Sequence, residues 1–274
     1  MTISLPDMFT ADNSEKYIMS IRLRSDGLFF SGYIPKVGET FFYQDFLFDK
    51  SIPYIDALKE YFYANDFFNW HFKKISILTD TSFYTLVPES AYQKKKNEEL
   101  LSFVFTSHPS RVLGDYLQDE KAYLVYGIDN EVYEFCNRSF LNPVFIHSLT
   151  PVFTLCQQQS RINLSAQMYA IIGEKKMDII VYVKDKLTFA NSFETKAWED
   201  YLYYILYIWK QNGLSQQNDL LFLSGENKTI QSLNQALNSY LRQIQPIKIP
   251  TEAYLLGNNI QQVPLDIIAL SVCE

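Results

Sequence analysis

Apolar and polar residues follow the same order of patterns twice along this chain. In the first half, three strand-like runs are expected at Tyr17–Arg24, Leu28–Pro35 and Thr40–Phe48. A helix is expected at Ile52–Phe68, where apolar residues recur at spacings of three and four. A short buried strand is expected at Lys74–Leu78. The predicted order of this unit is therefore strand, strand, strand, helix, strand.

The second half repeats this order. Its three strands are expected at Gln167–Gly173, Met177–Lys184 and Leu187–Phe193. A helix at Lys196–Gln211 is expected to end at Asn212-Gly213, a pair suited to a left-handed cap, and a fourth strand follows at Leu220–Leu223. Three more elements are expected after it: a helix at Thr229–Gln243, a strand at Ile247–Ile249 and a helix at Pro264–Val272.

The two copies also align residue by residue without a gap over residues 48–80 and 193–225. Phe48 aligns with Phe193, the acid Asp49 with Glu194, and the strand Ile75–Leu78 with Leu220–Leu223. Repetition of a whole supersecondary unit indicates a fold built from two copies of that unit.

The residues between the copies predict a separate set of elements. Strands are expected at Phe83–Val87, Ala122–Ile128 and Glu131–Phe135, and helices around Ala91–Phe105 and Thr150–Gln159. No Gly/Ser-rich or Pro-rich linker separates the halves. We therefore expect a polar tail at residues 1–16, a first unit at 17–160 with an insertion at about 83–160, and a second unit at 161–274.

Three antiparallel strands, a crossover helix and a parallel fourth strand make up the ribonuclease-H-like unit. Two such units resemble the actin-like ATPase superfamily, which includes actin, sugar kinases, the seventy-kilodalton chaperones and the pilus-assembly platform protein. The stretches IIGEKKMDIIVYVKDKLTFANSFETKAWEDYLYY and LLFLSG resemble an uncharacterised bacterial family, defined only as a domain of unknown function, whose members are credited with an actin-like fold. This resemblance spans Tyr17 to the C-terminus. It implies an α/β actin-like ATPase fold with two ribonuclease-H-like mixed-sheet units facing across a cleft. It also implies a distant similarity to the type IV pilus assembly platform protein.

The resemblance also implies where a nucleotide would bind. In the superfamily the first hairpin of each unit supplies a phosphate loop, Asp-x-Gly-(Ser/Thr). The acid holds the metal through water, and the glycine lets backbone N–H groups approach the phosphates. In the first unit the matching residues are Ser20 and Arg22, so both the acid and the glycine are replaced. Asp26-Gly27 is better explained as a hairpin turn.

In the second unit the acid of the phosphate loop is replaced by Ile171. A third superfamily loop carries two successive glycines after the fourth strand, and only the first of them is kept here. The resemblance therefore implies a degenerate nucleotide cleft without catalytic acids. Its candidate cofactor-binding residues are Gly173, Glu174, Ser224, Gly225 and Glu226.

Charge and composition exclude several classes of function. The net charge of −7 argues against non-specific nucleic-acid binding, which needs Lys and Arg against the phosphates. The three Cys and three His form no cluster at metal-ligand spacing, so we expect no metal site and no disulfide framework. Neither a signal peptide nor an apolar run of roughly 18–20 residues is visible, so we expect a cytoplasmic protein that is not inserted in a membrane. The 20 Tyr and 21 Phe are interpreted as core residues, and a base- or sugar-stacking surface is the alternative.

Three functional hypotheses remain. The first is a catalytically degenerate actin-like scaffold that binds an unidentified protein partner, with peripheral association with a membrane complex as an extension. ATP and magnesium are not expected to be required. The second is a nucleotide-binding ATPase or kinase-like enzyme with atypical phosphate loops. The third is a nuclease, which needs several acids at one two-metal centre, and neither first strand carries one. The missing phosphate-loop acids favour a protein that is not an enzyme.

Overall fold

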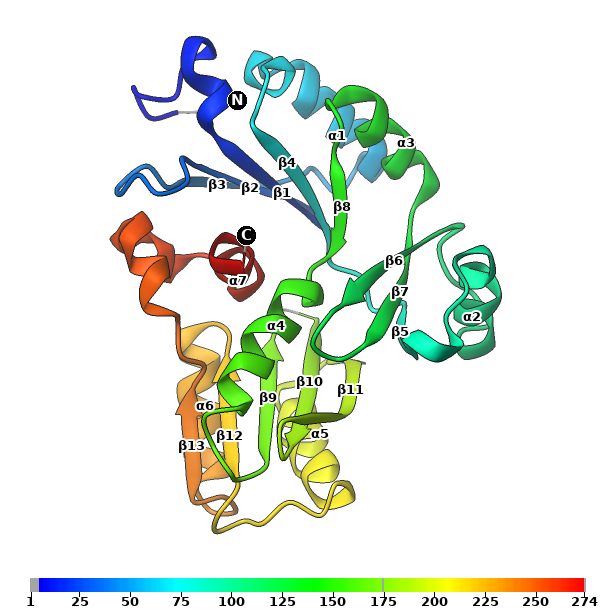
Figure 1. The fold of residues 1–274 in the computed structure, drawn as a ribbon, viewed down its shortest axis with the longest axis vertical. Coiled ribbons are helices and arrows are strands. Elements are labelled where there is room, and N and C mark those ends of the chain that lie inside the picture. The colour runs from blue at the N-terminus through cyan, green and yellow to red at the C-terminus, as the bar shows by residue number, and fades with distance from the viewer. Residues whose placement is uncertain (1–4, 174, 274) are drawn as a thin grey trace. The chain divides into compact units, whose positions relative to one another are not determined.

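The computed structural model describes residues 5–173 and 175–273. The chain divides into two compact units (Figure 1). The first comprises the residues up to Thr150 together with Pro250–Val272, and the second comprises Pro151–Ile249. The boundary thus lies ten residues earlier than the sequence suggests. The C-terminal segment, which the sequence places in the second unit, groups with the first.

The first unit is built on a five-stranded mixed sheet in the order β3-β2-β1-β4-β8. Strands β1, β2 and β3 are antiparallel neighbours, whereas β4 runs parallel to β1, and β8 runs parallel to β4. Helix α1 connects β3 to β4, and helix α3 leads into β8. The bounds are β1 (Ile18–Arg24), β2 (Gly27–Tyr33), β3 (Phe42–Leu47), α1 (Tyr54–Tyr63), β4 (Lys74–Thr79), α3 (Asn130–Ser139) and β8 (Val144–His147).

The second unit repeats this topology with the sheet order β11-β10-β9-β12-β13. Its bounds are β9 (Gln167–Ile172), β10 (Lys176–Val183), β11 (Lys186–Glu194), α5 (Trp198–Gln211), β12 (Leu220–Ser224), α6 (Asn227–Leu237) and β13 (Gln243–Pro246). The helix α5 ends at Asn212, and Gly213 follows with a φ of +64°, which is the left-handed residue expected there. The duplicated ribonuclease-H-like unit predicted from the sequence is confirmed, and the repeat includes a second helix and a fifth strand in each copy.

The insertion of the first unit is shorter than the sequence suggests. It is a three-stranded antiparallel sheet in the order β5-β7-β6, with one helix in the connection. Its bounds are β5 (Tyr84–Pro88), α2 (Asn97–Val104), β6 (Arg111–Leu117) and β7 (Ala122–Ile128). The helix and strand that follow, α3 and β8, extend the main sheet as α6 and β13 do in the second unit, so they belong to the repeat.

Two of the predicted strands are misplaced. The strand expected at Glu131–Phe135 is part of helix α3. Asp129 caps this helix, since its Oδ1 accepts hydrogen bonds from the backbone N–H groups of Glu131 (2.9 Å) and Val132 (3.0 Å). Val132 and Cys136, one turn apart, then face the core. The last strand of the second unit is β13, ahead of the expected Ile247–Ile249. Strands β6 and β8 were not expected from the sequence.

The gapless alignment of the two copies slips by one residue in the fourth strand. Ile75 and Ile77 of β4 lie in the first core, against the helices. Leu221 and Leu223 of β12 hold the same place in the second core. The alignment instead pairs Ile75 with Leu220. Because successive strand residues point to opposite faces, the gapless alignment places core residues of one fourth strand opposite residues on the other face of the second.

Each sheet also carries a helical segment on its other face (Figure 1). In the first unit this is the C-terminal segment, where Leu256 O accepts from Phe41 N–H (3.4 Å) and Gln262 Oε1 accepts from the Tyr43 hydroxyl (3.0 Å). In the second unit it is α4 (Leu149–Ser160), linked to β10 by the Tyr182 hydroxyl, which donates to Phe153 O (3.4 Å). The C-terminal segment consists of η5 (Thr251–Leu256), η6 (Asn258–Gln262) and α7 (Leu265–Cys273).

The remaining short helices are η1 (Ala11–Lys16), η2 (Asp66–Asn69), η3 (Glu89–Ala91) and η4 (Lys94–Lys96). Part of the expected polar tail is folded, because Phe9 is buried in the first core against Tyr17 and Trp70.

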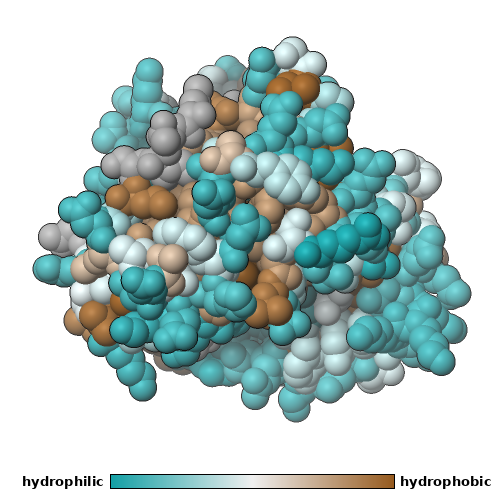
Figure 2. Space-filling view, turned by 90° about the horizontal axis from the view of Figure 1, so that it is seen from above, coloured by the Kyte–Doolittle hydropathy of each residue, from teal (hydrophilic) through white to brown (hydrophobic). Residues whose placement is uncertain are grey.

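On the face shown in Figure 2, hydrophobic residues occur as separate patches among hydrophilic ones. Large apolar side chains do reach the surface, and Phe103 is 92% exposed.

A buried carboxylate attaches the insertion to the first unit. Asp115 of β6 accepts hydrogen bonds at Oδ2 from the backbone N–H of His147 (2.7 Å) and from the Thr150 hydroxyl (2.6 Å). Burial raises the pKa of Asp115 to about 6, although these hydrogen bonds favour the ionised form. The insertion is therefore fixed to β8 and to the start of α4 through one side chain.

Candidate functional site

The resemblance to the superfamily aligns Arg22 with the glycine of the first phosphate loop. It lies within β1, opposite Phe29 of β2 and Leu78 of β4. Its neighbours Ile21 and Leu23 point into the helix-covered core, so the Arg22 side chain points to the other face of the sheet. A long charged side chain thus stands at the position that the resemblance aligns with a glycine.

Two carboxylates hold the Arg22 guanidinium. Its Nη2 lies 2.6 Å from Asp80 Oδ2, and its Nε lies 2.5 Å from Asp266 Oδ2. Asp80 directly follows β4 and also accepts a hydrogen bond at Oδ1 from the Ser148 hydroxyl (3.2 Å). Asp266 lies in the first turn of α7, where a negative charge is favourable. We call these three residues the Arg22 network.

The Arg22 network is largely removed from solvent. The side chains of Arg22, Asp80 and Asp266 are only 18%, 17% and 6% exposed. Burial raises the pKa of Asp266, the Arg22 charge counteracts this rise, and the nearby Asp80 charge adds to it. The guanidinium is thus already engaged by two acids. An incoming phosphate would have to displace a carboxylate and would meet the remaining negative charge.

Contacts within the first unit explain the Asp-Gly pair in the hairpin after β1. Asp26 Oδ1 lies 3.1 Å from Arg24 Nε, and the same guanidinium bonds Asp45 of β3 at 2.9 Å. A Cβ at Gly27 would lie 1.9 Å from Phe46 O. Gly27 is therefore explained by the close approach of β3, and Asp26 by its ion pair.

In the second unit, Gly173 directly follows β9. Its N–H donates to Lys176 O (2.9 Å), and its carbonyl oxygen accepts from the Tyr201 hydroxyl (2.9 Å). Glu174 lies outside the described residues. The nearby acid Asp178 is buried and accepts from the Ser192 hydroxyl, and its Oδ2 lies 3.3 Å from Lys176 Nζ. Lys176 and Asp178 are therefore both engaged within the unit.

The remaining candidate residues lie beside this hairpin. Ser224 ends β12 opposite Ile171, and Gly225 follows with a φ of +152°, a conformation that favours glycine. A Cβ on Gly225 would lie 2.8 Å from Ile172 O. Glu226 is the exposed N-cap residue of α6, without a side-chain capping bond. The structure therefore brings Gly173, Ser224, Gly225 and Glu226 to one edge of the second sheet, where Gly225 has a packing reason to be glycine.

Sequence reasoning singled out Arg22 only as a replacement and did not pair it with Asp80 or Asp266. The pairing with Asp80 could have been found, because Asp80 directly follows the fourth strand and so lies at the edge where β1 also ends. Asp266 is 244 residues away along the chain, and no local pattern indicates that it meets Arg22.

Among residues 5–173 and 175–273, no three His, Cys, Asp or Glu side chains group closely enough to hold a metal ion. No helix in this described part has the length and apolar character needed to span a membrane.

Two ribonuclease-H-like units, each with a sheet of the same strand order, define a protein of the actin-like ATPase fold. The chain belongs to the family described as "Protein of unknown function (DUF3822)", whose model matches residues 6–244. No curated protein matches the chain.

Two solved structures show the same fold. One is a protein with actin-like ATPase fold and unknown function from Bacteroides thetaiotaomicron. It is 27% identical, with a TM-score of 0.84, and the match covers 97% of this chain and 100% of that one. The other is in a PilM–PilN type IV pilus biogenesis complex, with 13% identity, a TM-score of 0.55 and coverage of 93% and 96%. At that identity the second likeness concerns the fold alone.

Proposed function

We propose that this chain is a scaffold protein of the actin-like fold that binds a protein partner and does not depend on ATP. The observation that carries the proposal is the Arg22 network. Arg22 fills the position of a phosphate-loop glycine, and both of its carboxylate partners come from the same unit. A side chain held in this way supports the unit's own structure and leaves no cradle of backbone N–H groups for a phosphate.

The acids that could replace the missing phosphate-loop carboxylates are engaged elsewhere. Asp26 pairs with Arg24, Asp80 with Arg22, and Asp178 with Ser192 and Lys176. Magnesium-dependent phosphoryl transfer needs acids that hold the metal and cations that neutralise the phosphates. The arrangement in each unit supports a role without phosphoryl transfer.

Binding to a protein partner is supported by the neighbouring fold and by the surface. The PilM structure was solved in complex with another protein, PilN. Large apolar side chains of the present chain are also exposed, such as Tyr63 and Phe103. Aromatic residues such as these are enriched in protein–protein interfaces. By analogy with the pilus biogenesis complex, we extend the proposal to a cytoplasmic protein that associates peripherally with a membrane complex.

The test is calorimetric titration of the full chain with ATP and magnesium. We expect no binding stronger than about 1 mM. A matched variant, Ser224→Arg, places a long side chain at the end of β12 and leaves the strained Gly225 untouched. Micromolar binding to the natural chain that is lost in Ser224→Arg would overturn the proposal. It would favour the alternative, a nucleotide-binding ATPase or kinase-like enzyme with atypical phosphate loops.

A further inference from the structure

The second unit has an accessible edge strand. β11 is the terminal strand of its sheet and pairs only with β10 among the strands of the described chain. Every residue from Met177 to Tyr182 of β10 is buried, whereas all nine residues of β11 are half-buried or exposed. The backbone N–H of Ser192 donates to the adjacent Asn191 Oδ1 (3.0 Å), so this donor is satisfied locally by a side chain. A long accessible edge of this kind is a template for pairing with another strand.

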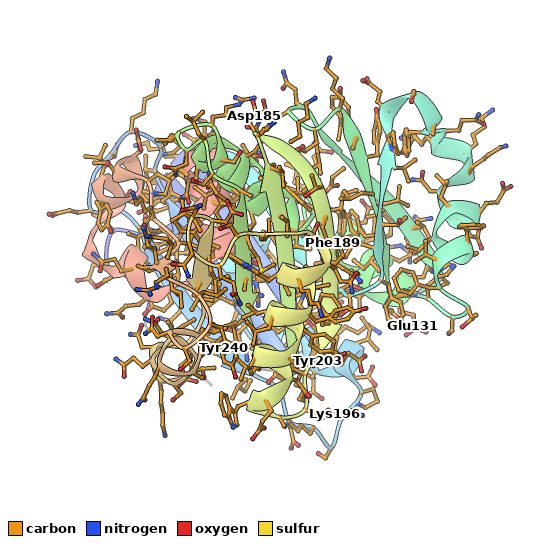
Figure 3. All side chains as sticks on the ribbon, turned by 90° about the horizontal axis from the view of Figure 1, so that it is seen from below. Glu131, Asp185, Phe189, Lys196, Tyr203 and Tyr240 are labelled. Atoms are coloured by element: carbon orange, nitrogen blue, oxygen red, sulfur yellow. The ribbon has the colours of Figure 1, made fainter. Side chains whose placement is uncertain are left out.

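An unbroken series of aromatic rings leads from this edge to the exposed side of α5. Phe189 and Phe193 of β11 stack with centroids 6.3 Å apart, and Phe193 stacks on Tyr204 at 4.4 Å. Tyr204 then contacts Tyr203 at 5.3 Å, and Tyr203 stacks on Tyr207 at 5.7 Å. Tyr203 and Tyr207 are 60% and 46% exposed. We call these five rings the aromatic ladder, of which Figure 3 labels Phe189 and Tyr203.

The exposed stripe of α5 ends in opposite charges. Glu199, Tyr203, Tyr207 and Lys210 are spaced by four, four and three residues, so they share one side of the helix. Glu199 lies in the first turn and Lys210 in the last. If two such helices lie antiparallel, Glu199 of each faces Lys210 of the other, and Tyr203 of each faces Tyr207 of the other. The stripe is therefore complementary to itself.

We propose that two copies of this chain associate through β11 and α5 across a two-fold axis. The two β11 strands pair antiparallel with the axis near Asn191, so that Phe189 of each copy lies opposite Phe193 of the other. The two sheets join into one continuous sheet. The same axis, perpendicular to the sheet, places the two α5 helices side by side and antiparallel on one face.

The geometry of β11 restricts the register of this pairing. The pairing of β10 and β11 is regular from Lys176–Glu194 to Val181–Phe189, and the register shifts at Val181/Tyr182, which leaves Thr188 as an extra residue. Regular pairing with a second strand is therefore available from Phe189 to Glu194. In this stretch Phe189, Asn191 and Phe193 share the face that carries α5, so pairing Phe189 with Phe193 keeps the aromatic ladder on one face.

A second copy suits this surface better than an unrelated protein. An isologous interface requires one patch to match itself, which the charges of α5 and the residues of β11 both do. Nine residues of β11 and the ten residues of α5 that are not buried can contribute, 19 in all. This number is close to the about 20–30 residues that a stable interface of standard size uses on each side. The proposal needs only the second unit and is independent of ATP binding.

Sedimentation velocity and light scattering on the full chain test this proposal. We expect a dimer for the natural chain and a monomer for Tyr203→Glu/Tyr207→Glu, because burying the carboxylates would leave them without partners. The matched control is Tyr240→Glu, at a side chain that is 50% exposed in the same unit but outside the aromatic ladder, and it should remain dimeric. A natural chain that is monomeric at about 100 μM overturns the proposal. So does a double variant that remains a dimer.

Exchanging the charges at the two ends of α5 tests whether the two copies associate through antiparallel α5 helices. Glu199→Lys and Lys210→Glu each place like charges at both ends of the paired helices, so each variant alone should dimerise about tenfold more weakly. A mixture of the two restores opposite charges at both ends and should form mixed dimers with the natural affinity. If the mixture is no tighter than either variant alone, the antiparallel pairing of α5 is wrong.

Discussion

The two units share a topology but fill the equivalent face of their sheets in different ways. In the first, Arg22 of β1 is neutralised by Asp80 and by Asp266 of the C-terminal segment. In the second, the corresponding strand β9 carries Tyr169 and Ile171 on that face, beside the ion pair Lys176–Asp178, which lies within β10. The same topology therefore accommodates either an ion network that joins three elements or an ion pair within one strand. The Arg22 network also ties a segment that is distant in sequence to its sheet.

The largest expected effect comes from breaking the Arg22 network. Arg22→Met removes the cation from two carboxylates, Asp80 and the buried Asp266, and we expect the free energy of unfolding to fall by about 3 kcal/mol. The matched change in the second unit is Lys176→Met. It should lower stability by about 2 kcal/mol, because it removes the cation from one carboxylate, Asp178, rather than from two. Urea denaturation of both variants measures the difference.

The double variant Arg22→Met/Asp266→Asn serves as the control, because it removes the buried charge together with its partner. It should be more stable than Arg22→Met alone. Equal losses of stability for Arg22→Met and Lys176→Met would contradict the expectation that the Arg22 network stabilises its unit more than the Lys176–Asp178 pair does.

The next effect concerns the glycine retained in the second unit. Gly225→Ala introduces a Cβ 2.8 Å from Ile172 O at a φ of +152°, so we expect a loss of about 2 kcal/mol. Gly213→Ala is the comparison, because its φ is +64° and nothing lies within 4 Å of the added Cβ, and it should cost about 1 kcal/mol. Thermal unfolding orders the two variants. If Gly225→Ala is the milder change, packing against β9 does not explain why this residue is glycine.

Some of these features could be predicted from the sequence and others could not. The repeated strand order was predictable, because alternating strands and a three-four helix period are local signals. The α3 helix was mistaken for a strand, because the run from Glu131 to Phe135 is short and rich in β-branched and aromatic residues, and the capping role of Asp129 was overlooked. The Arg22 network was not predictable, because Asp266 is remote in sequence and only the folded chain brings it to β1.

The insertion, which only the first unit has, carries a buried carboxyl group, Asp115, that makes the free energy of unfolding depend on pH. The folded pKa of Asp115 is about 6, above its ordinary value, so between about pH 4 and 6 the folded state holds a proton that the unfolded state has released. This group's contribution to stability is therefore full below about pH 4 and is lost as the pH rises through 6.

Asp115→Asn removes that titration. We expect the variant to gain stability relative to the natural chain as the pH rises from about 4 to 6, and to stay parallel to it above about 7. Urea midpoints measured at intervals across this range provide the check. Parallel curves throughout would mean that the pKa of Asp115 is the same in the folded and unfolded states, so that burial does not disfavour its ionised form.

The smallest expected difference separates the two helices that lead into the fifth strands. In the first unit Asp129 caps α3 with hydrogen bonds to two backbone N–H groups, so Asp129→Ala should lower stability by about 1 kcal/mol. In the second unit Glu226 holds the same place before α6 without a side-chain capping bond. Glu226→Ala should therefore change stability by less than about 0.5 kcal/mol, the remaining effect being its charge at the helix N-terminus. Chemical denaturation of the two alanine variants decides between these expectations. A loss at Glu226 as large as that at Asp129 would mean that this carboxylate has a structural partner in solution, and it would remove Glu226 from the residues available to a ligand.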